Sequence, residues 1–80
     1  MNKDEIVHET LNGEKAEALE CVVASAGLSK RTKSEDKVVI IQLVTINDIV
    51  LPALALDLEQ AEILRYMIDK VLKIANAENN

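Results

Sequence analysis

The sequence predicts a small α+β domain with an antiparallel β-hairpin at its centre and a long amphipathic helix at its C-terminal end. Two observations lead to this class. β-Branched and other aliphatic residues crowd the segment from Val38 to Leu56, on both sides of Asn47-Asp48. From Leu58 onward the chain uses strong helix formers, with apolar residues at helical spacing.

The C-terminal helix has a clear start signal and an unusually wide apolar side. Asp57 precedes Gln60 by three residues, which matches a capping box whose carboxylate accepts from a first-turn amide. The apolar residues cover nearly half of the circumference, more than the roughly 100° that a surface helix needs. They are Leu58, Ala61, Ile63, Leu64, Met67, Ile68, Val71, Leu72, Ile74 and Ala75.

The central aliphatic blocks predict one β-hairpin. Asn47-Asp48 suits a two-residue turn, because both residue types tolerate positive φ, and that turn makes Ile46 face Ile49. Pro52 has no amide hydrogen, so the second strand is expected to be an edge or to bulge there. One predicted face carries Val39, Ile41, Leu43, Val50, Leu54 and Leu56. The other carries Val38, Ile40, Val44, Ile46, Ile49 and Leu51, with Gln42 as its polar member.

The N-terminal third supports two interpretations. Residues 14–27, EKAEALECVVASAG, contain good helix formers, and Gly27 could end a helix in a left-handed conformation. Alternatively, Asn12-Gly13 is a strong hairpin signal, which would pair the segments before and after it. Ala and Glu are poor strand residues, so an N-terminal helix is favoured over a hairpin.

Apolar surface in this chain exceeds what one copy can cover. Both predicted hairpin faces are aliphatic, and a lone two-stranded hairpin is at best marginally stable in water. A homo-oligomer, most simply a dimer, is therefore expected. The residues expected at its interface are Val38, Ile40, Val44, Ile46, Ile63 and Met67.

Composition limits the classes of partner. The 80 residues predict one domain, 1–80, with termini at 1–4 and 76–80 that fray. A net charge of −5 disfavours direct binding to nucleic acid or to an anionic membrane surface. The charged N-terminal residues do not resemble a signal peptide, and no apolar run approaches the length of a membrane span. A cytoplasmic, soluble protein is expected.

No residue pattern predicts catalysis, a cofactor or a metal. His8 is the only histidine and Cys21 the only cysteine, too few for a His/Cys metal cluster. No positively charged residue flanks Cys21 to activate its thiol, so a Cys21–His8 nucleophile pair is not expected. The glycine spacing of a phosphate-cradling loop is absent as well. The chain is therefore predicted not to be an enzyme.

Two other surfaces are candidates for binding. The first is a polar loop with cations and hydroxyls that could hold a phosphate group, formed by Ser29, Lys30, Arg31, Thr32, Lys33 and Ser34. The second would contact a protein. It contains Tyr66, on the polar side of the C-terminal helix, and a ridge of acids that an N-terminal helix would align: Glu14, Glu17 and Glu20.

These features rank three functions. The first is a small acidic protein that acts without catalysis, by binding and inhibiting or modulating a larger protein complex, as small α+β proteins of bacteria and viruses often do. The second is an oligomeric binder of a phosphorylated small molecule or nucleotide, through the loop at residues 29–34. The third is a structural assembly subunit.

Overall fold

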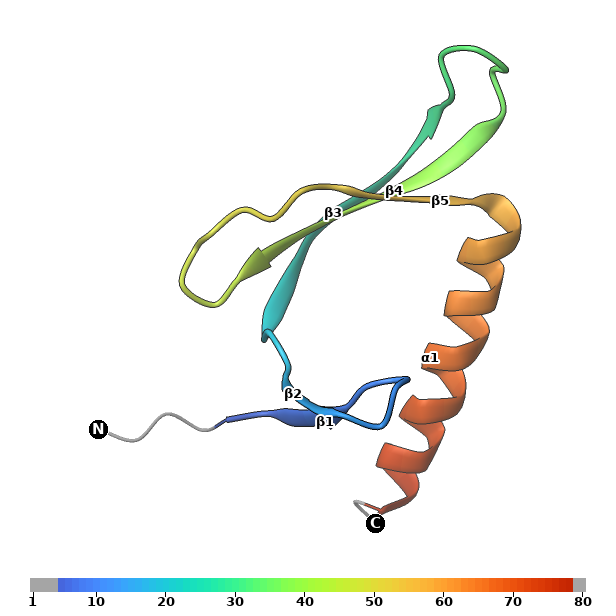
Figure 1. The fold of residues 1–80 in the computed structure, drawn as a ribbon. Helices are drawn as coiled ribbons and strands as arrows, with labels where there is room; N and C mark the ends of the chain where they lie inside the picture. The colour runs from blue at the N-terminus through green and yellow to red at the C-terminus, as the bar shows by residue number, and fades with distance from the viewer. Residues whose placement is uncertain (1–4, 79–80) are drawn as a thin grey trace.

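A computed structural model of the chain describes residues 5–78. It is an α+β fold with two antiparallel sheets and one C-terminal helix (Figure 1). A two-stranded sheet comes first, and a three-stranded sheet with strand order β3-β4-β5 follows it. The predicted N-terminal helix is therefore wrong, and the predicted central hairpin is part of a larger sheet.

The first sheet is the hairpin that Asn12-Gly13 indicated. Strand β1 (Val7–Glu9) pairs with β2 (Lys15–Glu17). Gly13 lies between them at a φ of 82°, a left-handed conformation that glycine adopts without steric cost. The local turn chemistry therefore prevailed over the helix propensity of the Ala and Glu residues that follow.

Strand β3 (Cys21–Lys30) occupies the segment expected to end the helix. It pairs antiparallel with β4 (Lys37–Thr45), with a β-bulge between Val23 and Ser25. Gly27 lies inside this strand opposite Ile40 and does not cap a helix. The aliphatic strand β4 needs a partner on each edge, and this tertiary pairing outweighs the local helix propensity of the segment.

Strand β5 (Leu54–Asp57) covers the other edge of β4. The chain between Leu51 and Leu54 contains one residue more than the stretch of β4 opposite it, since Leu51 donates to the Leu43 carbonyl while Leu54 pairs with Ile41. Pro52 lies in this segment with the extra residue, and β5 is an edge strand. Both features agree with the prediction made from the missing amide hydrogen of Pro52.

Two turns of the fold share one sequence pattern and one set of hydrogen bonds. In Thr10-Leu-Asn-Gly13 the threonine carbonyl accepts from Gly13 N, and in Thr45-Ile-Asn-Asp48 it accepts from Asp48 N, both at 2.9 Å. The threonine hydroxyl accepts from the amide that follows, at 3.3 Å in the first turn and 3.0 Å in the second. Asp48, like Gly13, has positive φ (66°). Each is a three-residue hairpin loop that ends in a left-handed residue.

The second turn corrects the predicted register. Thr45 lies opposite Ile49, and Val44 bridges Val50. The expected two-residue turn with Ile46 facing Ile49 is therefore wrong by one residue. The shift moves Val50 and Leu51 to the faces opposite those predicted, because one step along a strand reverses the side.

The C-terminal helix α1 (Leu58–Glu78) agrees with its prediction. Asp57 Oδ1 accepts from Gln60 N at 2.9 Å, so the predicted N-cap is present. The helix includes residues 76–78, where fraying was expected, while residues 1–4 and 79–80 lie outside the described chain. No helix in the range 5–78 is long and apolar enough to cross a membrane.

The fold is open rather than collapsed around one core. In Figure 1 α1 leaves the end of β5 and runs away from the sheet, and the β1–β2 hairpin forms a separate arm. The Cα radius of gyration is 15.7 Å, whereas a compact domain of this length would have about 12 Å. Among the described residues only Val38 (6% exposed) and Thr45 (5%) are buried. Most of the aliphatic side chains therefore still face solvent.

Candidate functional site

The sheet presents one aliphatic face toward α1. Paired residues of neighbouring strands share a face, so the register places Leu28 and Leu56 beside Val39, and Ala26 and Leu54 beside Ile41. An open groove of about 310 Å³ separates this face from the first half of α1. It is lined by Ala26, Val39, Ile41, Leu56, Ala61, Leu64, Arg65, Ile68 and Asp69.

Farther along α1 the apolar side chains have no partner within the described chain. Met67, Ile68, Val71 and Leu72 form a shallow, wholly apolar hollow of about 230 Å³ on the helix itself. Val71 is 63% exposed, and Ile63, Met67, Leu72 and Ile74 are exposed as well. We call the exposed residues Ile63, Leu64, Met67, Ile68, Val71, Leu72 and Ile74 the α1 stripe.

The α1 stripe and the groove are continuous, because Leu64 and Ile68 belong to both. The helical periodicity of the sequence predicted the helix half of this surface. The contribution of β3 was not predicted, because its segment was assigned to a helix. The β-bulge between Val23 and Ser25 interrupts the alternation of this strand, which removes the period-two signal from the sequence.

The residues predicted at an oligomer interface do not form one surface. Val38, Ile40 and Val44 lie on the sheet face opposite the groove, since they alternate with Val39 and Ile41, and Val38 is buried within the single chain. Ile46 lies at the β4 turn. Ile63 and Met67 belong to the α1 stripe.

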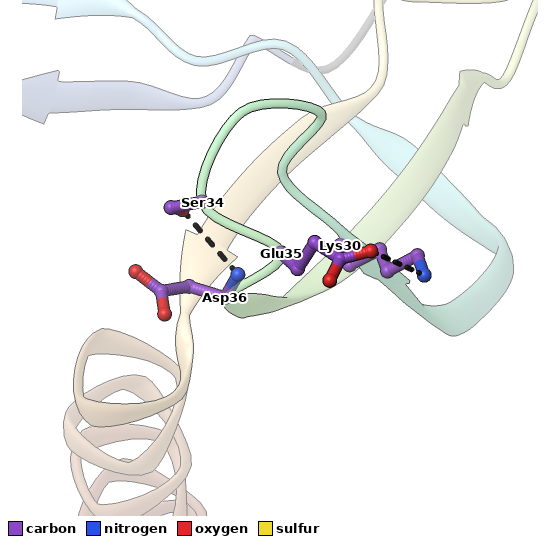
Figure 2. A network of polar contacts seen from close by, with 4 residues as sticks. All are labelled: Lys30, Ser34, Glu35 and Asp36. Carbon is purple, nitrogen blue, oxygen red and sulfur yellow. Dashed lines mark hydrogen bonds and ion pairs between the residues drawn. The ribbon is translucent and has the colours of Figure 1, made fainter.

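The predicted phosphate loop joins β3 to β4, and one of its three cations is paired with a carboxylate of the same connection. Lys30 Nζ lies 3.3 Å from Glu35 Oε1, and Ser34 Oγ accepts from Asp36 N at 3.3 Å (Figure 2). Arg31 N donates to Asp36 O at 2.8 Å, which closes the loop. Arg31, Thr32 and Lys33 are exposed. Ser29 and Lys30, with Leu28 and Lys37, line an open hollow of about 350 Å³.

Tyr66 projects from α1 into solvent. Its side chain is 64% exposed, and Lys70 Nζ lies 5.3 Å from the ring centroid. Such a cation–π contact at an exposed site contributes about 0.5–1 kcal/mol. Its position on the polar side of the helix agrees with the helical arithmetic, whereas its predicted contact with a partner stays a prediction.

The three N-terminal acids do not form the predicted ridge, because the helix that would align them is absent. Glu14 follows the Gly13 turn, Glu17 ends β2, and Glu20 lies in the link to β3. Glu17 and Glu20 instead line, with Glu5, a hollow of about 480 Å³ between the hairpin and the β4 turn. Glu14 is not among its lining residues.

The isolated candidates for chemistry lie on strands of different sheets. His8 is exposed on β1, and Cys21 Sγ lies 3.4 Å from the Leu19 carbonyl at the start of β3. Within residues 5–78 no group of three or more His, Cys, Asp or Glu side chains could hold a metal ion.

No protein-family model, no curated protein and no solved structure matches this chain. The candidate site is therefore defined by its own geometry: an aliphatic surface shared by α1 and the β3–β4–β5 sheet.

Proposed function

We propose that this chain acts without catalysis, by binding a protein molecule and modulating it through the surface shared by the groove and the α1 stripe. The observation that carries the proposal is the continuous exposure of aliphatic side chains from the groove to Ile74. Exposed apolar patches on soluble proteins are commonly interaction sites, since covering them removes apolar area from water.

The chemistry of the groove suits a protein surface better than a small polar ligand. Its floor is formed by Val39, Ile41 and Leu56, and the charged side chains of Arg65 and Asp69 stand at its helix side. A hydrophobic centre with a polar rim is typical of protein interfaces. An aliphatic helix stripe is also the feature through which one helix packs on another.

The proposal is tested with two variants of the purified chain. Val71 and Tyr66 are almost equally exposed, at 63% and 64%, but lie on different sides of α1. A carboxylate at either position therefore costs little in the isolated chain. Val71→Glu should abolish binding to any protein that co-purifies with the wild type, and Tyr66→Glu should preserve it if the apolar side alone is the contact. Equal binding by Val71→Glu and the wild type would contradict the proposal.

A further inference from the structure

We infer that the protein bound by the α1 stripe is a second copy of this chain, with the two α1 helices packed against each other across a two-fold axis. The inference rests on the proposed protein-binding role of this surface. It adds the identity of the partner and the geometry of the contact.

The exposed area indicates an obligate partner. The accessible surface of the chain is 7373 Å², whereas a folded monomer of 8.8 kDa exposes about 4,800 Å². The difference is about 2,600 Å². An obligate homodimer buries on the order of 1,000–2,500 Å² on each subunit, whereas a standard-sized complex buries about 800 Å² on each side. Only a large, permanent interface removes an excess of this size.

A second copy supplies a matching surface. In a two-fold pair the same patch meets itself, so an aliphatic stripe on one chain faces an aliphatic stripe on the other. Met67 and Val71 lie one turn apart at the centre of the α1 stripe and can interdigitate with the same residues of the second copy. Each groove would then be closed at its open end by the second helix.

The helix pairing explains why the net charge of −5 does not prevent self-association. The strands of the N-terminal hairpin, which carry Glu9 and Glu17, make no contact with α1 among the described residues. The exposed outer edge of β3 has no partner strand among the described residues and offers a competing way to dimerise. The test below separates the two contacts.

Sedimentation equilibrium on the full chain tests the inference. We expect a dimer at micromolar concentration, a monomer for Val71→Glu, and a dimer for Tyr66→Glu, with helical circular dichroism retained in both variants. A wild-type monomer across the micromolar range would overturn the inference. If Val71→Glu still loses a different protein partner in that case, the proposed function survives alone; if it loses nothing, both fail.

A second variant repeats the test at another position of the α1 stripe. Met67→Glu should also give a monomer, because Met67 is 58% exposed and lies one turn from Val71. Lys73→Glu, near Tyr66 on the polar side of α1, is the matched control and should leave the dissociation constant of the homodimer unchanged. A dimer retained by both Val71→Glu and Met67→Glu would overturn the contact through α1 and indicate pairing through β3.

Discussion

Gln42, the polar residue within the aliphatic strand β4, donates a hydrogen bond from its side-chain amide to the carbonyl of Leu51. That carbonyl lies where the β4–β5 register shifts by one residue before Pro52. An extra residue in an antiparallel pair interrupts the ladder and leaves backbone groups without strand partners. The Gln42 amide supplies a partner at this interruption.

Replacing Gln42 with Leu should lower the free energy of unfolding by about 1 kcal/mol, the usual contribution of one hydrogen bond. The loss should appear in urea denaturation, together with faster amide exchange around Leu51. Gln60→Leu, at an exposed helix position, is a matched control that keeps the backbone amide used by the cap. If Gln42→Leu is as stable as the wild type, the bond does not support this segment.

Removing the Asp57 side chain should uncap α1. Asp57→Ala should cost about 1 kcal/mol of stability, whereas Asp57→Asn keeps an oxygen that can accept from the Gln60 amide. Thermal unfolding followed by circular dichroism at 222 nm measures the difference. Asp69→Ala, in the helix interior, serves as the control; an equal loss there would show that the effect is not capping.

Substitutions at the left-handed residues of the two related turns, Asp48 and Gly13, should change stability in opposite directions. Asp48→Gly removes the steric cost of a side chain at a φ of 66° and should maintain or raise stability by up to about 1 kcal/mol. Gly13→Ala introduces that cost at a φ of 82°. Because the β1–β2 hairpin is a separate sheet, the stability lost in Gly13→Ala should appear as faster local amide exchange at Glu14. The global unfolding midpoint should change little. A stability gain for Gly13→Ala would contradict this account.

The phosphate-binding hypothesis for residues 29–34 requires the Lys30–Glu35 pair to open. Glu35→Gln should therefore increase the thermal stabilisation produced by a nucleotide panel, since Lys30 would be released for the anion. Lys30, Arg31 and Lys33 replaced together by Ala should abolish it. An unchanged melting temperature of the wild type and of Glu35→Gln across the panel would exclude this function.

Tyr66→Ala should lower the free energy of unfolding by less than about 1 kcal/mol, because the exposed ring can lose little beyond its contact with Lys70. If Tyr66 is a recognition anchor for a further protein, the same change should weaken that binding by about 2 kcal/mol. Calorimetric titration and a melting curve separate the two effects, with Tyr66→Phe as the control. A large loss of stability would mean that the ring is buried in the assembled protein.

Local signals predicted α1 and β4 well. The periodicity from Leu58 and the Asp57 cap are encoded within a few residues, and so is the β-branched run that forms β4. The strand β3 could not be read in the same way, because Ala and Gly within CVVASAG adopt strand geometry only when β4 lies beside them. The turn at Thr45 was misassigned because a three-residue loop, not a two-residue one, satisfies the threonine hydroxyl.

The candidate site was only partly predictable for the same reason. Its helix half follows from sequence spacing, whereas the sheet half depends on a register that brings Ala26, Val39 and Leu56 together from three strands. The predicted acidic ridge was wrong, because the N-terminal helix that would have aligned Glu14, Glu17 and Glu20 is absent. Compensation of Lys30 by Glu35 depends on the closed loop, which a count of charges could not reveal.

The lack of Trp and Phe leaves Tyr66 as the single fluorophore of this protein, and it lies on α1. Ultraviolet emission and near-ultraviolet dichroism therefore report on the helix, while the sheets contribute no aromatic signal of their own. The ring resonances in a proton spectrum come from one residue besides His8. Without any label, the optical signal of the chain becomes a local probe of what happens along one side of one helix.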